Sequence, residues 1–227
     1  MTVAREVVRQ VDHFSRAQAF TTTSTGEMGW TIADTSSAGT PTYLCLTDNG
    51  GAAKLLLAST SEAENVCLYQ GDVLPYDLAL LQYVKFVAKV GGVDAVTTLT
   101  MGVGSARNDT EDSVSINAWF RMEGSASTTL VVCETDDGTT DYDDKATTVA
   151  LSSTYKEFVI DFTNGLSDIR FYIDGARVAS GTTFTLASIT ADQNVQLIVQ
   201  LAKASGTGVP SVTISKVEVQ FKTADGA

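Results

Sequence analysis

The segment 161–178, with the sequence DFTNGLSDIRFYIDGARV, limits the fold of this chain more narrowly than any other part of it. It contains two turn dipeptides, Asn164-Gly165 and Asp174-Gly175, each flanked by apolar residues. Asn, Asp and Gly tolerate the positive φ angles that tight hairpin turns require. We therefore predict a strand that ends at Phe162, a second strand over 169–173 and a short return strand. The segment predicts an antiparallel sheet.

The same pattern of short strands and polar turns continues through most of the chain from Tyr43 onward. Val114, Ile116, Ala118 and Phe120 lie on one face of the predicted strand, and Ser115, Asn117 and Arg121 lie on the other, which is typical of a strand with one buried face. The apolar phase of the last strand shifts near Ser215-Lys216, and this shift predicts a β-bulge. Many short strands separated by turns favour an all-β antiparallel β-sandwich over alternating strands and helices.

Charge and cysteine content exclude several classes of function. The net charge is −12, and such an acidic chain is a poor partner for nucleic acid, because phosphate contacts need clustered cations. The three cysteines, Cys45, Cys67 and Cys133, are isolated within apolar stretches. We expect buried free thiols in a reducing compartment. No signal peptide and no apolar run long enough to cross a membrane are expected.

The N-terminal residues have a different pattern. Val3, Val7, Val8, Val11 and Phe14 follow helical spacing, and Ser/Thr-rich residues follow them. We expect a short helix or arm over residues 1–25, followed by the sandwich over 26–227. The helix either covers the sandwich or docks on another subunit. In the docking hypothesis the contact residues are Arg5, Val7, Arg9, Val11, Phe14 and Arg16.

An acidic loop with six carboxylates in eleven residues lies at 134–144. Calcium takes six to eight oxygen ligands, so the loop is a candidate Ca²⁺ site, although its spacing does not match an EF-hand. The alternatives are a solvated acidic loop and a contact for a basic partner. No other cofactor is expected. The candidate ligands are Asp136, Asp137, Asp141 and Asp143.

The same loop resembles part of the catalytic motif of laminarinase-type glycoside hydrolases. Those enzymes carry Glu-x-Asp-x-x-Glu on one strand, with two carboxylates as nucleophile and acid/base. Here Glu134 and Asp136 match, but Thr139 stands where the acid/base belongs. The only histidine, His13, is far from every cysteine in sequence. We therefore expect that the protein is not an enzyme.

Exposed aromatic residues beside polar loops are typical of carbohydrate-binding sites. Trp119 and Tyr172 lie on predicted strands, opposite the alternating apolar faces. Both are candidates for a glycan-binding surface. For Trp119 the alternative is coverage by a neighbouring layer or subunit.

The chain as a whole resembles virion structural proteins of tailed bacteriophages, in particular capsid decoration (cement) proteins with a concanavalin-like jelly roll. The resemblance covers roughly residues 26–222 and depends mainly on 155–178, with Gly29-Trp30, Trp119-Phe-Arg121 and 134–139 in support. It implies a protein that stabilises an icosahedral shell from outside by binding the assembled state. The implied partners are the major capsid protein and copies of itself as a trimer, with no nucleic acid and no membrane.

In this hypothesis the protein is made in the host cytoplasm and resides on the capsid surface. Deleting residues 1–20 is expected to abolish particle binding and to leave the sandwich folded. The alternative function is a carbohydrate-binding, lectin-like module on a virion surface or tail.

Overall fold

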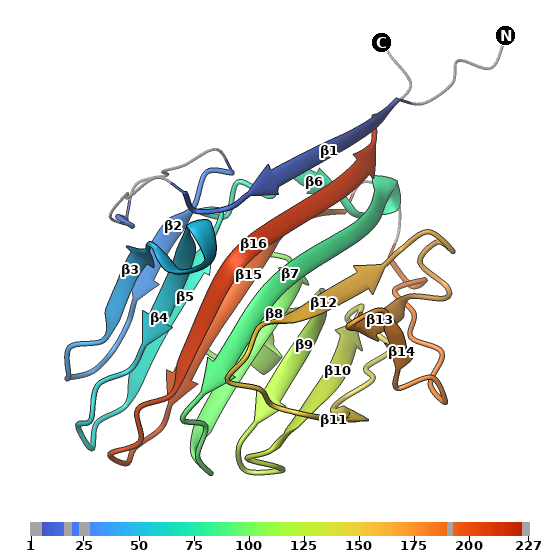
Figure 1. The fold of residues 1–227 in the computed structure, drawn as a ribbon. Helices are drawn as coiled ribbons and strands as arrows, with labels where there is room; N and C mark the ends of the chain where they lie inside the picture. The colour runs from blue at the N-terminus through green and yellow to red at the C-terminus, as the bar shows by residue number, and fades with distance from the viewer. Residues whose placement is uncertain (1–5, 16–19, 23–27, 190–192, 224–227) are drawn as a thin grey trace, which may run out of the picture.

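The computed structural model describes residues 6–15, 20–22, 28–189 and 193–223, and it contains two antiparallel eight-stranded sheets that face each other (Figure 1). The first sheet has the order β14-β13-β12-β7-β16-β4-β3, with β1 also paired to β16. Its strands are β1 (Val7–Asp12), β3 (Thr42–Leu46), β4 (Ala52–Leu56), β7 (Leu81–Gly91), β12 (Lys156–Asp161), β13 (Arg170–Ile173), β14 (Ala176–Val178) and β16 (Ser211–Lys222).

The second sheet has the order β11-β10-β9-β8-β15-β5-β2, with β6 paired to β15. Its strands are β2 (Thr31–Asp34), β5 (Glu64–Tyr69), β6 (Tyr76–Asp77), β8 (Thr97–Gly104), β9 (Asn117–Glu123), β10 (Leu130–Asp136), β11 (Lys145–Ala150) and β15 (Asn194–Lys203). The helical elements in the described residues are three 3₁₀ turns, η1 (Asp48–Gly50), η2 (Leu78–Leu80) and η3 (Glu111–Ser113). The predicted all-β antiparallel sandwich is confirmed.

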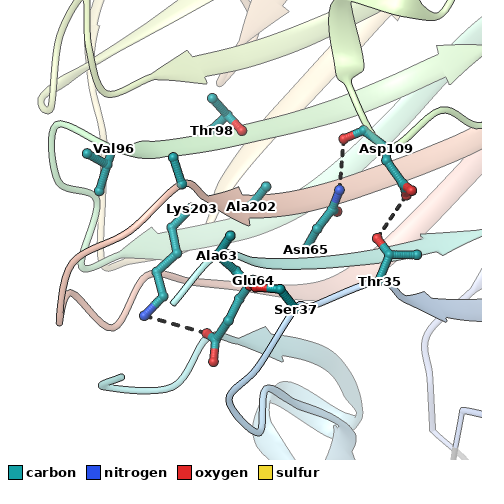
Figure 2. A pocket seen from close by; sticks show the side chains of 11 residues that line it. Thr35, Ser37, Ala63, Glu64, Asn65, Val96, Thr98, Asp109, Ala202 and Lys203 are labelled. Atoms are coloured by element: carbon teal, nitrogen blue, oxygen red, sulfur yellow. Dashed lines mark hydrogen bonds and ion pairs between the residues drawn. The ribbon is translucent and has the colours of Figure 1, made fainter. Parts of the chain in front are cut away.

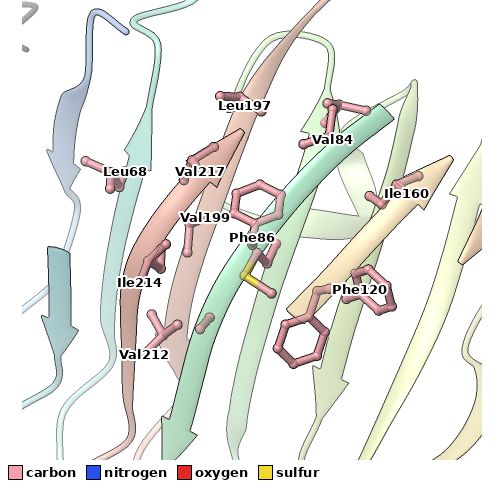
Figure 3. Close-up of a cluster of buried hydrophobic side chains, with 14 of the residues drawn as sticks. Leu68, Val84, Phe86, Phe120, Ile160, Leu197, Val199, Val212, Ile214 and Val217 are labelled. Atoms are coloured by element: carbon pink, nitrogen blue, oxygen red, sulfur yellow. The ribbon is translucent and has the colours of Figure 1, made fainter. Parts of the chain in front are cut away.

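The inner faces of the two sheets enclose a hydrophobic core (Figure 3). Phe120 on β9 is fully buried, and its ring meets Phe158 and Phe171 of the first sheet with centroids 5.2 Å apart in each pair. Each aromatic ring buries on the order of 150–250 Å² and gains further from edge-to-face contact. The core therefore ties β9 of the second sheet to β12 and β13 of the first.

The hairpin segment folds as the sequence predicts. β12, β13 and β14 pair in succession, and Asp174 and Gly175 at the second turn have φ angles of 49° and 77°. The predicted bulge in β16 is also confirmed, because its register with β7 shifts between Ile214 and Lys216. Both features depend on local patterns of turn residues and side-chain alternation.

The N-terminal segment differs from the prediction. β1 pairs antiparallel with β16, from Val7 opposite Lys222 to Asp12 opposite Val217, so the predicted helix is wrong for residues 7–12. The valines follow helical spacing. As a strand, however, the segment forms hydrogen bonds with the backbone groups along the part of the β16 edge that β4 does not pair. Residues 7–12 form a strand and not a helix because pairing with the sheet and burial of side chains both stabilise the extended conformation.

Cys67 and Cys133 are buried free thiols, and Cys45 is half-buried. Within the described part of the chain, no helix has the length and apolar character needed to cross a membrane.

Candidate functional site

The outer face of the second sheet carries side chains that are buried although they point away from the core. Successive residues of a strand point to opposite faces, so Phe120 on β9 points inward while Trp119 and Arg121 point outward. Trp119 is fully buried and Arg121 is 6% exposed, yet neither belongs to the hydrophobic core. Another part of the chain must therefore cover this face.

Strand pairing places the outward side chains in rows across the sheet. The first row consists of Asn65, Ala202, Thr98 and Glu123. The second row consists of Cys67, Gln200, Thr100, Arg121 and Val132. The third row consists of Tyr69, Ile198, Gly102, Trp119 and Glu134. Four or five neighbouring strands thus contribute to each row.

Residues 105–116, which we call the cover segment, cross these rows. The backbone carbonyl of Asp109 accepts hydrogen bonds from the side-chain amides of Asn65 (2.8 Å) and Gln200 (3.1 Å). Thr98 donates to Glu111 (2.7 Å) in η3, which belongs to the cover segment. Side chains from the first two rows therefore hold the segment against the sheet.

Arg121 is the centre of the charge network on this face. Its guanidinium lies 2.6 Å from Asp112 of the cover segment, 2.9 Å from Glu134 on β10 and 3.1 Å from Glu123. Asp144 lies further away, at 3.9 Å. One buried cation thus links the floor of the sheet, the cover segment and the loop after β10.

Burial governs the titration of the carboxyls around Arg121. It raises the pKa of Glu134 to about 7, and the attraction of Arg121 only partly opposes this rise. It also raises the pKa of Glu111 and of Asp144. Burial lowers the pKa of Arg121, but Glu134, Asp112 and Asp144 together outweigh that effect and the pKa of Arg121 rises. The guanidinium is therefore always charged, whereas Glu134 titrates near neutral pH.

Two pockets lie on this face, and Thr98 lines both. The Arg121 pocket, of about 520 Å³, is lined by Thr98, Glu111, Asp112, Arg121, Glu123, Ser125, Asp141, Asp143 and Asp144. The Asn65 pocket, of about 340 Å³, is lined by Thr35, Ser37, Ala63, Glu64, Asn65, Val96, Thr98, Asp109, Ala202, Lys203 and Ala204 (Figure 2). The cover segment contributes Asp109 to one pocket, and Glu111 and Asp112 to the other. The pockets therefore lie along one line across the strands.

A fully buried ion pair lies at the end of the Asn65 pocket (Figure 2). The ammonium of Lys203 lies 3.6 Å from Glu64 and donates to the carbonyls of Ala58 and Thr60, the latter at 2.7 Å. It also donates to the carbonyl of Gly206 at 3.1 Å. A buried charge needs partners of this kind to offset its desolvation. The pair fixes this end of the pocket.

The four predicted calcium ligands do not form one metal site, although Asp136 and Asp141 pair in an isolated β-bridge. Asp136 accepts a hydrogen bond from the amide of Gly138, and Asp137 accepts from the amides of turn residues. Asp141 and Asp143 instead line the Arg121 pocket, where burial and the neighbouring Asp143 raise the pKa of Asp141. Among the described residues, no group of three or more His, Cys, Asp or Glu side chains is placed to hold a metal ion.

The two candidate glycan-binding aromatics lie on different sheets. Trp119 points outward from the second sheet, as alternation predicts, and it is fully buried, which agrees with the alternative of coverage and not with an exposed glycan-binding position. Tyr172 lies on β13 of the first sheet, and it is half-buried between the inward residues Phe171 and Ile173. The two side chains therefore cannot contribute to one binding surface.

The predicted docking residues are spread along and beyond β1. Val7 and Arg9 are exposed, and Arg9 forms a 2.5 Å ion pair with Glu218 of β16. Val11 is half-buried, and Phe14 is buried against Trp30. Arg5 and Arg16 lie outside the described residues. Phe14 thus belongs to the core and is not free for a partner.

Sequence reasoning identified Trp119, Asp141 and Asp143 as candidates, but it missed the other residues that build the site. Arg121 carries a visible signal, because it is a charge within the apolar run Ala-Trp-Phe-Arg-Met of β9. Asn65 and Thr98 carry none, since single polar residues on strands are common on exposed faces. Glu111 and Asp112 lie in the long β8–β9 connection, and only the folded chain shows what they contact.

No protein-family model and no curated protein matches the chain. Solved structures do resemble it. A protein of unknown function from Shewanella oneidensis has a TM-score of 0.64 and 10% identity, over 100% of this chain and 91% of that one. A family 16 endo-glucanase from Bacteroides ovatus has a TM-score of 0.64 and 11% identity, over 92% and 99%. A β-1,3-glucanase from Mycobacterium marinum has a TM-score of 0.59 and 14% identity, over 92% and 97%.

The fold is a concanavalin-like jelly roll. Its neighbours include glycoside hydrolases that act on glucans, and this overturns the expectation that the chain is not an enzyme, because the same architecture carries glycan hydrolysis in those proteins. The neighbours also favour the carbohydrate-binding alternative over capsid decoration. The capsid partner, the trimer and the virion location stay predictions from the sequence alone.

Proposed function

We propose that this protein is a glycan-active jelly roll that binds a glycan chain across the outer face of its second sheet. The observation that carries the proposal is the alignment of two polar pockets, joined at Thr98, across neighbouring strands. Sugars are recognised by a few placed polar groups in a concave site, and both pockets supply carboxylates and hydroxyls for sugar hydroxyls. The glycan-active neighbours support the same reading.

The charge of the Arg121 pocket favours a neutral glycan. Six carboxylates line it, and its single cation, Arg121, already pairs with several of them. Excess negative charge repels uronic acids and sulfated sugars, most strongly at low ionic strength. A neutral glucan, the class named for several structural neighbours, fits this pocket better.

Replacing Asp141 with asparagine is expected to weaken the binding of a soluble mixed-linkage glucan roughly tenfold, because a hydrogen bond to a charged group contributes about 1.5–3 kcal/mol. Asp141 is exposed and lines the Arg121 pocket, so the sheet itself is left intact. Isothermal titration calorimetry measures the change. The matched control is Glu157→Gln, which removes one negative charge from the first sheet. Equal affinities in wild type, Asp141→Asn and Glu157→Gln would contradict this binding site.

Hydrolysis is a second candidate activity, and the titration of the Arg121 pocket favours it. Glycoside hydrolysis needs one protonated and one ionised carboxyl. Burial raises the pKa of Glu111, which favours its protonated form there, beside Asp112, which forms an ion pair with Arg121. β10 ends at Asp136, so Thr139 lies beyond the strand and the second carboxylate has to come from the pocket loops.

If the protein hydrolyses glucan, Glu111→Gln is expected to lower the rate of reducing-end release about 100-fold or more, the usual effect of losing a general acid. The measurement is a reducing-sugar assay on the same soluble glucan between pH 5 and 7. Glu157→Gln serves again as the charge-matched control. A rate that is unchanged in Glu111→Gln would exclude this carboxyl as the acid.

A further inference from the structure

The surface beneath the cover segment contains polar atoms that lack hydrogen-bond partners. Of the eight buried side-chain atoms of this kind in the described residues, five lie on the outer face of the second sheet. They belong to Asn65, Thr100, Asn117, Trp119 and Arg121. Buried polar atoms are normally paired, and each exception needs a specific explanation. Trp119 is paired with Glu134 across β9 and β10, and its indole N–H partly opposes the rise that burial causes in the pKa of Glu134, although the contact lacks the geometry of a normal hydrogen bond.

The cover segment directly contacts the residues on both sides of Trp119. Asn117 donates to the carbonyl of Val114 (3.3 Å), and Arg121 pairs with Asp112 (2.6 Å). A Cβ added to Gly102 would lie 2.6 Å from the Cβ of Trp119, so the glycine leaves room for the indole over β8. Trp119 is therefore fully buried beside Gly102, between two residues that the cover segment contacts, and outside the main core.

Polar contacts account for most of the attachment of the cover segment. Asp109, Glu111 and Asp112 are joined to the sheet by hydrogen bonds and an ion pair. Arg107 lies over the ring of Tyr69, 5.6 Å from its centroid. Val114 is the buried apolar side chain of the segment. Water replaces such polar contacts at a small net cost, so the segment can open without disturbing the core.

We propose that residues 105–116 form a displaceable cover, and that the surface beneath it, centred on Trp119, is the deeper part of the glycan-binding site. This inference rests on the proposed function, and it names the groups that would contact the sugar. The apolar face of a neutral sugar ring packs on the indole of Trp119. Sugar hydroxyls then pair with Thr100, Asn117 and Arg121, whose free atoms have no partner in the covered state.

The opening of the cover can be tested without a glycan. In a Trp30→Phe background Trp119 is the only tryptophan, and acrylamide quenching reports its accessibility. Loosening the cover with Glu111→Gln and Asp112→Asn should raise the quenching constant at least about twofold, since local opening exposes the ring. Glu157→Gln, which lies on the first sheet, should leave it unchanged. An unchanged quenching constant in the loosened variant would contradict the proposal that residues 105–116 form a displaceable cover.

A second measurement uses the unmodified protein and so does not depend on how the variants fold. Amide hydrogens in 105–116 should exchange roughly 100-fold faster than those in β9, because the cover opens while the sheet stays paired. Equal protection of the two segments would refute the cover. Soluble mixed-linkage glucan should alter both this exchange and the fluorescence of Trp119. Fast exchange without any response to glucan would keep the cover but refute the glycan role of the surface.

Discussion

Replacing Arg121 with methionine should lower the free energy of unfolding by about 3–5 kcal/mol at pH 8, the cost of leaving a buried charge without its partner. Glu134 is 2% exposed and depends on Arg121 for its nearest positive charge, 2.9 Å away. Methionine keeps the length and apolar stem of the side chain but removes the guanidinium. Urea denaturation followed by circular dichroism measures the loss.

The loss should be smaller at pH 5, and the sign follows from the pKa of Glu134. Burial raises this pKa to about 7 in the folded protein, above its ordinary value near 4.5. The folded state therefore holds the proton to higher pH than the unfolded state, and stability falls as pH rises through this range. Without Arg121 the folded-state pKa rises further. At pH 5 Glu134 is protonated and neutral in the folded protein, so the loss of the Arg121 guanidinium lowers the free energy of unfolding by less.

The double variant Arg121→Met, Glu134→Gln is the matched control. It removes both charges, so its stability should recover part of the loss at pH 8 and show a weaker dependence on pH. A destabilisation of Arg121→Met that is identical at pH 5 and pH 8, and unchanged in the double variant, would contradict the pairing of these two side chains.

Deleting residues 1–20 should lower the free energy of unfolding by roughly 5 kcal/mol or more, since a single buried phenylalanine contributes about 3–5 kcal/mol. The deletion removes two, Phe14 and Phe20, which are 5% and 7% exposed. Their rings lie 6.2 Å apart, and the ring of Phe14 lies 5.8 Å from that of Trp30. It also removes Asp12, which accepts a hydrogen bond from the indole of Trp30 (3.0 Å).

This result would differ from the sequence-based expectation of a detachable arm. Loss of β1 also exposes the edge of β16, which is a site for unwanted strand pairing, so aggregation should accompany the loss of stability. Val7→Ala is the control within β1. Val7 is 51% exposed, and its replacement should change stability by less than about 0.5 kcal/mol. A shortened chain with the unfolding midpoint of the full chain would restore the arm hypothesis.

On the outer face of the second sheet, the sequence predicts the direction of the side chains but not their exposure. Alternation along β9 correctly directs Trp119 away from the core, and it does so for Arg121 as well. Exposure does not follow from direction, because the cover segment lies on top. The ion pair of Arg121 with Glu134 joins strands separated by a loop, and its register depends on how β9 and β10 align.

Local patterns in the sequence determined the hairpins of segment 161–178, the bulge between Ile214 and Lys216 and the antiparallel sandwich, because turn residues and side-chain alternation act between near neighbours. Only the tertiary structure decided three other features. Residues 7–12 became a strand because β16 offered a free edge, Trp119 was buried beside the folded-back connection before β9, and Thr98 came to line two pockets. The strand and the pockets depend on contacts between segments far apart in the chain, and the burial of Trp119 depends on how the connection packs on the sheet; single-residue preferences are too weak to specify either.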